Sequence, residues 1–441
     1  MKQQVFKKRR QALMQRIGLG NIALIQSASP SVRNRDVDFP FRQDSDFYYL
    51  TGFNEPEALA VFIPGREQGE YILFCREFDK TKALWEGAHA GLEGATKHYK
   101  ADDAFPIEDL DDILPNMLEG KKQVFYPMGR DSELDQHLLE WINHLRSQSR
   151  LGLMAPSELV ALDFIIHEMR LFKDAEELTL MRRAAEVSAQ AHINAMQKCR
   201  EGLYEYQIEA ELIYCFMQQG LRHVAYPSIV AAGKNACTLH YTKNTGQLIS
   251  GELLLIDAGA ECDHYAADIT RTFPISGRFT EPQKLLYQLV LDAQTAAIAQ
   301  VKPGASWNHA HEAAVETLTK GLVALGLLKG SVKKLIKDEK YKAFYMHRTG
   351  HWLGMDVHDV GEYKINQHWR LLEPGMVLTV EPGLYIPAHC KTVDKQWRGI
   401  GIRIEDDVLV TATGHEVLTQ SVPKSIVEIE QLMQERYVAG L

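Results

Sequence analysis

The sequence predicts an α/β protein of two domains, a smaller amino-terminal domain followed by a larger carboxy-terminal one. The chain has 441 residues, which is too long for one ordinary core. Short apolar runs also alternate with longer helical patterns along its length. Between the two parts, Asp174 is followed three residues later by Glu177, a spacing that resembles a capping box at the start of a new helix. We therefore expect the domains to span residues 1–170 and 171–441.

The amino-terminal domain shows the pattern of a small mixed sheet with helices. Its β-rich runs lie at residues 22–25, 58–63 and 71–74, and residues 133–147 have helical spacing. The carboxy-terminal domain begins with two helical stretches, the second of them closed by Gly220. Strands then alternate with further helices. The helices expected in this domain are at 175–198, 205–219, 282–301 and 307–325.

Two aspartates stand at the ends of strand-like segments in the carboxy-terminal domain. Asp257 closes a short apolar run bounded by glycines, residues 251–259, which is typical of a buried strand. Asp268 lies in the next such segment, and we expect the two segments to form an antiparallel hairpin with the carboxylates facing each other. Alternation places Thr270 on the side of Asp268 and Arg271 on the opposite side. Facing carboxylates repel unless a cation neutralises them.

A second acidic pair repeats this arrangement. Glu381 ends a hydrophobic strand directly before a proline, and Glu405 shares one strand face with Arg403, opposite a row of isoleucines. A structural salt bridge from Arg403 to an acid is an equally good interpretation of that arginine. We expect Asp406 and Asp407 to belong to the strand edge and not to the site.

Histidines add a nitrogen donor to this set. His347, His351 and His358 fall within twelve residues in a segment punctuated by glycines, and His240 lies just before the aspartate hairpin. A single histidine is more often structural. Three histidines in one segment of a chain that also has four strand-end carboxylates favour a role as metal ligands.

These residues indicate a dinuclear metal centre. Four carboxylates and one imidazole form a hard, oxygen-rich set, which suits two Mn(II) ions better than zinc, although cobalt and zinc stay open alternatives. Such a pair of ions can hold a water as hydroxide and polarise a carbonyl, the requirements for hydrolysing a peptide bond. The expected ligands are Asp257, Asp268, His351, Glu381 and Glu405.

Several long motifs resemble those of the pita-bread metallopeptidases, in particular the bacterial aminopeptidase P group. The resemblance spans the whole chain, because residues 41–58 also look like that group's amino-terminal domain. Long ordered motifs of this kind are far more specific than a bare glycine pattern. In the catalytic domain the motifs are residues 255–259, 268–273, 350–361, 372–385 and 401–406.

The resemblance implies a role for each site residue. The five ligands are those expected above, with Asp268 and Glu405 bridging, and Glu381 is also placed to shuttle a proton. His358 would support the oxyanion and His240 the leaving side. His347 belongs with these histidines around the metals and the substrate, and Arg403 matches the group's arginine beside the last ligand. Trp85 and Tyr385 match positions near the substrate. Arg348 departs from the small or apolar residues that are usual there, which could alter the mouth of the site.

The implied fold is a pita-bread catalytic domain, and the implied activity is that of an Xaa-Pro aminopeptidase, a metal-dependent exopeptidase. It would release the first residue of peptides whose second residue is proline, using a hydroxide held by two metal ions. A prolidase restricted to Xaa-Pro dipeptides is an alternative within the same class. A metal-free relative, either a peptide-binding module or a creatinase-like hydrolase, is disfavoured because all five ligand positions are intact.

Composition restricts the partners and the compartment. A formal net charge of -9 with 45% hydrophobic residues describes a soluble globular protein and argues against binding nucleic acid or an anionic membrane. The sequence has no signal-type or membrane-spanning apolar run. Its six cysteines have no disulfide or zinc-module spacing, which favours the cytoplasm. We expect peptide substrates and a homo-oligomer, a dimer or a tetramer.

Overall fold

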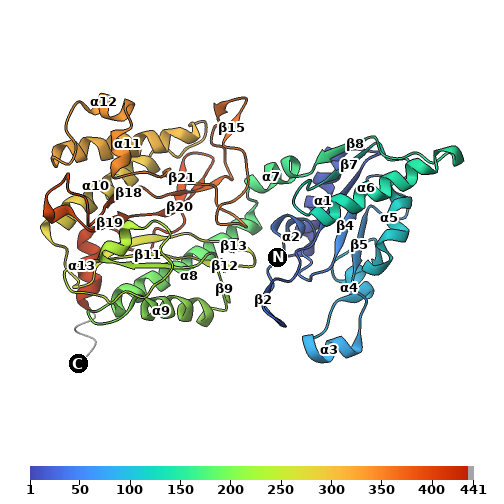
Figure 1. Cartoon of the computed structure of the whole chain (residues 1–441), viewed down its shortest axis with the longest axis horizontal. Coiled ribbons are helices and arrows are strands. Elements are labelled where there is room, and N and C mark those ends of the chain that lie inside the picture. The colour runs from blue at the N-terminus through green and yellow to red at the C-terminus, as the bar shows by residue number, and fades with distance from the viewer. Residues whose placement is uncertain (436–441) are drawn as a thin grey trace. The chain divides into compact units, whose positions relative to one another are not determined.

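The computed structural model describes residues 1–435 and divides into two compact units, Met1–Arg170 and Leu171–Leu441 (Figure 1). Residues 436–441, the end of the predicted catalytic domain, lie outside the described residues. In the described part of the chain, no helix is both long and apolar enough to cross a membrane.

The amino-terminal unit is built on one six-stranded mixed sheet in the order β6-β5-β4-β1-β7-β8. β1 pairs antiparallel with β4 and parallel with β7, so the sheet mixes hairpin and crossover connections. The β-rich runs of the sequence become β1, β4 and β5. The strands are β1 (Ile22–Gln26), β2 (Val32–Asn34), β3 (Val37–Asp38), β4 (Leu59–Phe62), β5 (Tyr71–Cys75), β6 (Asp103–Pro106), β7 (Gln123–Tyr126) and β8 (Glu158–Ala161), of which β2 and β3 form a separate hairpin.

Helices α5 and α6 supply the apolar side chains that pack on this sheet, among them Leu114 and Leu138, which are fully buried. The predicted helix at 133–147 is α6, and Asp131 caps it by accepting from the backbone N–H groups of Glu133 and Leu134. The helices are α1 (Gln3–Ile17), α2 (Ser45–Thr51), α3 (Lys80–Glu86), α4 (Gly91–Lys97), α5 (Leu110–Leu118), α6 (Ser132–Ser147) and α7 (Asp163–Leu171).

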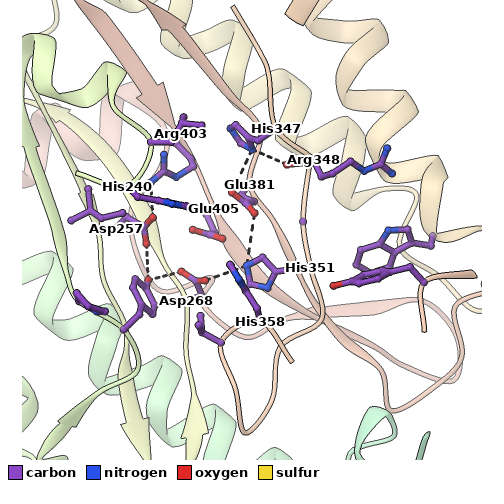
Figure 2. Close-up of a pocket in the computed structure, with 18 of the residues that line it drawn as sticks. His240, Asp257, Asp268, His347, Arg348, His351, His358, Glu381, Arg403 and Glu405 are labelled. Carbon is purple, nitrogen blue, oxygen red and sulfur yellow. Dashed lines mark hydrogen bonds and ion pairs between the residues drawn. The ribbon is translucent and has the colours of Figure 1, made fainter. Parts of the chain in front are cut away.

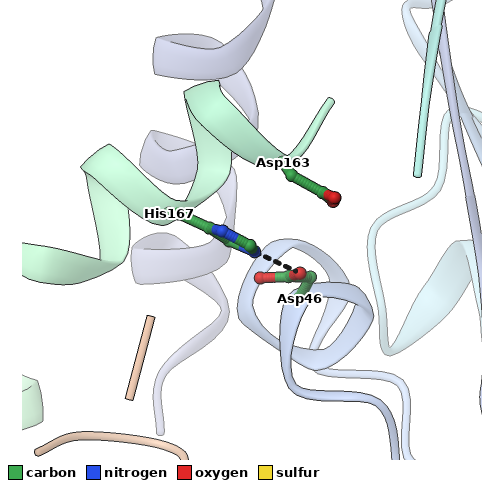
Figure 3. Close-up of side chains that lie close together, drawn as sticks. All are labelled: Asp46, Asp163 and His167. Carbon is green, nitrogen blue, oxygen red and sulfur yellow. Dashed lines mark hydrogen bonds and ion pairs between the residues drawn. The ribbon is translucent and has the colours of Figure 1, made fainter. Parts of the chain in front are cut away.

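A buried ion-pair network joins α2 to α7. Asp46 of α2 lies close to Asp163 and His167 of α7 (Figure 3). Although such a trio could hold a metal ion, two arginines already neutralise it: Arg170 Nη1 lies 2.7 Å from one oxygen of Asp46, and Arg130 Nη1 lies 2.8 Å from the other. Burial opposes ionisation of Asp46, but the charge of Arg170 and the hydrogen bond from His167 outweigh it and hold the pKa of this carboxyl well below its usual range. Asp46, Asp163 and His167 therefore form part of a structural salt-bridge network with these arginines.

In the carboxy-terminal unit the strands lie between two pairs of long helices, α8 with α9 and α10 with α11 (Figure 1). α8 begins with the predicted capping box, in which Asp174 accepts from the N–H of Glu177 and the Glu177 side chain accepts from the N–H of Asp174. All four predicted helices are present, to within a few residues at their ends. The helices are α8 (Ala175–Lys198), α9 (Glu205–Gln218), α10 (Glu281–Ile298), α11 (Trp307–Ala324), α12 (Val332–Lys337) and α13 (Ile426–Glu435).

The strands of this unit form several small antiparallel sheets. Two of them have three strands and carry the acidic segments, in the orders β10-β11-β14 and β17-β20-β21. A third, two-stranded sheet pairs β18 with β19. The strands are β9 (His223–Val224), β10 (Ile229–Ala232), β11 (Leu253–Asp257), β12 (Ala260–Cys262), β13 (Tyr265–Ala266), β14 (Thr270–Pro274), β15 (Lys364–Ile365), β16 (His368–Trp369), β17 (Val377–Val380), β18 (Gly383–Ile386), β19 (Ile400–Arg403), β20 (Asp406–Val410) and β21 (His415–Val417).

The expectation that Asp406 and Asp407 lie at a strand edge is wrong. Their strand, β20, is the middle strand of its sheet, and both side chains are buried. Asp406 is paired with Arg271, 2.7 Å away, and with Lys424, 2.5 Å away. Burial opposes its ionisation, but these two cations outweigh it and lower the pKa of Asp406. Asp406 can lie in a central strand because its charge is compensated by Arg271 and Lys424, which come from segments that are distant in sequence.

Candidate active site

Asp257 and Asp268 are brought together by the pairing of β11 with β14. The strands are antiparallel, as predicted, with Asp257 opposite Thr270, and Asp268 lies just before β14. The chain turns sharply at Gly259, where a Cβ atom would lie 1.7 Å from the carbonyl oxygen of Ala267. Only glycine permits this close approach, which delivers both carboxylates to the same pocket (Figure 2).

Glu381 and Glu405 enter the pocket from the ends of β17 and β19. The N–H of Glu381 donates to the carbonyl oxygen of Thr349 at 2.7 Å. Glu405 is fixed against β14, because its N–H donates to the carbonyl oxygen of Thr270 and its side chain accepts from the Thr270 hydroxyl at 2.7 Å. Alternation along the strand is as predicted, since Ile400, Ile402 and Ile404 point into the hydrophobic core.

His351 is oriented by its own neighbour. Its Nδ1 lies 2.9 Å from the carbonyl oxygen of Trp352, which turns Nε2 toward Asp268 at 3.5 Å and Glu381 at 3.8 Å. The segment reaches this position at Gly350, where a Cβ atom would lie 1.9 Å from the carbonyl oxygen of Thr379 on β17. The imidazole therefore faces the carboxylates with the nitrogen that a metal would bind.

The five predicted ligands all line one pocket of about 920 Å³. Ligand atoms of Asp268, His351 and Glu405 all lie within 4.8 Å of one another, a grouping that could hold a metal ion. Glu381 approaches His351 from the other side, and Asp257 is held by Arg403 Nη2 at 2.5 Å. Arg403 thus forms the salt bridge to an acid that the sequence allowed for. It also lines the pocket.

The charges of this cluster fit a divalent cation. Burial and the repulsion from Asp268 and Glu381 raise the pKa of Glu405 well above its usual range, and burial raises the pKa of Glu381 to about 7. Burial lowers the tendency of His351 to be charged, but the Asp268 hydrogen bond and the Glu381 charge outweigh it and raise its pKa to about 9. Protons on these groups therefore compensate the excess negative charge, which is the role a bound cation would take over.

The other predicted site residues lie around this cluster. His358 packs edge-on against His351, with ring centroids 4.3 Å apart, and burial together with the charge of His351 lowers its pKa. His347 Nε2 lies 2.9 Å from the hydroxyl of Tyr385, which also accepts from Arg403. His240 lines the pocket from the loop after β10 (Figure 2). Arg348 lines it as well.

Trp85 belongs to the amino-terminal unit and does not line this pocket. It lies on α3, with 86% of its surface exposed.

Tyr226 was not foreseen. Its hydroxyl oxygen lies 2.7 Å from Asp257 and 2.5 Å from Asp268, so one phenolic proton is shared between the two carboxylates. Burial and these carboxylates raise the pKa of Tyr226 well above its usual range. The position of Tyr226 just before β10, whose first residue Ile229 pairs with Asp257, is the feature that could have revealed it.

An aromatic wall, Trp307, Tyr363 and Trp369, also escaped the sequence-based prediction. Trp307 packs on Tyr363 with ring centroids 4.8 Å apart. The pocket thus combines an apolar aromatic lining with a polar cluster, as is expected of a site for a small organic ligand.

Comparison with known proteins agrees with this architecture. Residues 179–412 match metallopeptidase family M24, and residues 6–126 match the aminopeptidase P N-terminal domain. The chain is 44% identical to the Xaa-Pro aminopeptidase of Escherichia coli strain K12, over 98% of this chain and 97% of that protein. It is 32% identical to human Xaa-Pro aminopeptidase 3, over 95% and 82% of the two chains.

Solved structures extend the agreement to the fold. Aminopeptidase PepP of Pseudomonas aeruginosa is 56% identical and superposes with a TM-score of 0.98 over 99% of both chains. A zinc-substituted E. coli aminopeptidase P in complex with product superposes with a TM-score of 0.96 at 43% identity, over 99% of both chains. The predicted architecture, an amino-terminal α/β domain followed by a pita-bread catalytic domain, is confirmed. The chain belongs to metallopeptidase family M24, within its bacterial aminopeptidase P group.

Proposed function

We propose that this aminopeptidase acts as an Xaa-Pro aminopeptidase, releasing the amino-terminal residue of peptides whose second residue is proline. The observation that carries the proposal is the convergence of four carboxylates and His351 in one pocket that is also lined by Trp307, Tyr363 and Trp369. Its relatives named Xaa-Pro aminopeptidase match it along nearly the whole chain.

We assign the metal centre to Asp257, Asp268, His351, Glu381 and Glu405, which would hold two ions, and by the motif resemblance Asp268 and Glu405 would serve both of them. The spacing of Asp268, His351 and Glu405 supports this assignment. Two divalent ions in such a site supply a water nucleophile active at neutral pH and polarise the scissile carbonyl. We propose Mn(II) because the donor set is rich in oxygen and contains no sulfur.

The protein's own groups would handle the protons and the developing charge. By the motif resemblance, Glu381 would shuttle the proton between the attacking water and the leaving amine, and its side chain lines the pocket where this would occur. His358 stands beside His351 with an exposed ring and would donate to the oxyanion, while His240 would contact the leaving side. Arg403, held by Asp257 and Tyr385, would keep the carboxylates aligned together with His347.

Specificity for proline has a physical basis in the substrate. A proline after the scissile bond lacks an N–H group, so a site that depends on hydrogen-bonding that group cannot hold it well. An apolar wall binds the pyrrolidine ring without needing that donor. Trp307 and Tyr363 provide such a wall next to the polar cluster.

A prolidase restricted to dipeptides is the alternative. The pocket volume of about 920 Å³ lies near the top of the usual range for small-ligand sites, roughly 300–1,000 Å³, and favours substrates longer than a dipeptide. Product analysis on matched Xaa-Pro and Xaa-Pro-Yaa peptides with added Mn(II) decides between the two. Cleavage of the dipeptide alone would establish a prolidase, and cleavage of neither would refute the proposed function.

We further propose a cytoplasmic location and assembly into a dimer or tetramer. Four of the six free cysteines, Cys75, Cys199, Cys215 and Cys262, are buried, as is expected of a protein that works in a reducing compartment. We also propose that the functional boundary between the two domains falls at residues 170/171. Light scattering of the purified protein tests the assembly directly.

A further inference from the structure

The active-site pocket has two ends of opposite charge. Asp257, Asp268, Glu381 and Glu405 gather at one end, whereas Arg348 and Lys364 line the pocket elsewhere. The guanidinium of Arg348 points away from the carboxylate cluster (Figure 2). We call Arg348, Lys364 and Trp369 the basic rim. Trp369 also belongs to the aromatic wall, whereas Arg348 and Lys364 take no part in the proposed hydrolysis.

Both cations of the basic rim make cation–π contacts with the indole of Trp369. Arg348 Cζ lies 4.9 Å from its ring centroid and Lys364 Nζ lies 4.4 Å from it. Lys364 and Trp369 are paired across the β15–β16 hairpin, whose two turn residues, Asn366 and Gln367, both have positive φ. The hairpin therefore contributes Lys364 and the aromatic platform, and Arg348 reaches the same indole from the segment just before His351.

Arg348 is held in place by amide oxygen and not by an acid. Its Nη2 donates to Asn308 Oδ1 at 2.5 Å, and Asn308 Nδ2 in turn donates to Glu312 Oε1 at 2.6 Å. Within residues 1–435, neither Arg348 nor Lys364 has a carboxylate within ion-pair distance. A guanidinium has five N–H donors, and in the described structure only the bond to Asn308 uses one. The guanidinium of Arg348 is therefore held in one orientation but keeps N–H donors with which it can bind an anion.

We propose that the basic rim binds the free carboxy terminus of short peptide substrates. This inference rests on the proposed function, because an aminopeptidase places the amino end of its substrate at the acidic cluster and the rest of the peptide runs outward through the pocket. In a peptide of three or four residues the other end is a carboxylate, the planar anion that the arginine fork matches best. The preferred substrates are thus short Xaa-Pro peptides with an unblocked carboxy terminus.

The test uses one Xaa-Pro-Yaa tripeptide as its free acid and as its carboxy-terminal amide, with the Mn(II)-loaded enzyme. Because Arg348 is solvent-exposed, we expect a modest preference for the acid, about fivefold in kcat/KM at low ionic strength, which shrinks in high salt. Arg348→Gln should raise KM for the acid, leave the amide unchanged and so abolish the preference. Arg278→Gln is the matched control, since Arg278 is exposed and does not line the pocket.

Two further variants separate charge from orientation. Arg348→Lys should keep part of the preference, and Asn308→Ala should weaken it because the guanidinium loses the oxygen that orients it. A binding readout is independent of turnover: the product Pro-Yaa should inhibit competitively more strongly than Pro-Yaa amide, and Arg348→Gln should equalise the two inhibition constants.

The outcomes distinguish this inference from the function on which it rests. If the wild-type enzyme cleaves acid and amide equally well, or if Arg348→Gln keeps the preference for the acid, the basic rim does not bind the carboxy terminus. The proposed aminopeptidase function is unaffected by either result. If neither peptide is cleaved in the presence of metal, the proposed function itself is wrong and the inference falls with it.

Discussion

Arg403 Nη2 lies 2.5 Å from Asp257 Oδ2, which joins two strands whose residues are 146 positions apart in the sequence. The same guanidinium donates to the hydroxyls of Thr270 and Tyr385. A buried arginine with three anchors fixes the position of Asp257 and offsets part of the negative charge of the cluster. The pair therefore links the stability of the fold to the geometry of the site.

Replacing Arg403 with Met should destabilise the protein and weaken metal binding. Asp257 would lose its buried counter-charge, and breaking such a pair costs about 3–5 kcal/mol. Urea unfolding of the chelator-treated protein and metal titration measure the two effects. Arg278→Met, at an exposed site, is the control and should change neither. Wild-type stability and metal affinity in Arg403→Met would show that the pair is dispensable.

Chelation should abolish activity, and Mn(II) should restore it. The nucleophile that the site can supply is water activated by bound metal, and the sequence shows no serine or cysteine triad. Activity on an Xaa-Pro-Yaa peptide is measured after removal of metal and after titration with Mn(II), with Ca(II) as the control ion. Full turnover in a preparation proven free of metal would refute the mechanism.

Glu405→Ala should lose most activity and most bound metal, because a carboxylate shared by two ions compensates both of their charges. Asp407→Asn is the matched control two residues away. Asp407 is also buried, and burial together with the charge of Asp268 raises its pKa well above the usual range, so a neutral amide is a close substitute. Metal analysis should find an occupied site in Asp407→Asn and a depleted one in Glu405→Ala. The reverse pattern would mean that the ligand has been placed at the wrong residue.

His358→Ala should retain metal and slow turnover by about a hundredfold, the usual cost of removing an oxyanion donor. His351→Ala should instead impair metal binding, because His351 Nε2 faces Asp268 and Glu381. Metal content and steady-state kinetics on the same two variants separate the roles. An empty site in His358→Ala with a full one in His351→Ala would reverse the assignment.

Asp46→Asn should destabilise the amino-terminal unit by about 3 kcal/mol at pH 7, since it removes the buried charge that Arg170 Nη1 contacts at 2.7 Å. The folded-state pKa of Asp46 is lowered, so its contribution is present above the unfolded value of about 3.9 and is lost as the pH falls through the folded value. The difference between wild type and variant should therefore shrink in acid. Urea unfolding of both proteins between pH 7 and pH 3 measures it, with the partly exposed Asp103→Asn as a control of small effect. A constant difference at all pH values would contradict this account.

The strand-end carboxylates could be predicted because their signals are local. An apolar run bounded by glycines before Asp257, and a proline directly after Glu381, mark where a strand stops and a side chain enters a polar layer. The capping box at Asp174 is equally local. The individual roles of the ligands came from the motif resemblance and not from spacing.

Features that depend on pairing between distant segments could not be predicted. Arg271 and Asp406 are 135 residues apart, so nothing near Asp406 in the sequence shows that its charge is compensated inside a central strand. Tyr226 reaches both aspartates only once β10 has paired with β11. The β15–β16 hairpin turns at Asn366-Gln367, which lacks the glycine that usually marks such a turn.

The proposed metal ligands are spread from Asp257 on β11 to Glu405 after β19. During synthesis on the ribosome, the amino-terminal unit can complete its sheet with β8, long before Glu405 is made. The metal centre, by contrast, has no complete ligand set until nearly the entire chain has left the exit tunnel. With the proposed ligands, a nascent or truncated chain would lack part of the metal site, and we expect hydrolytic activity only when the polypeptide is essentially finished.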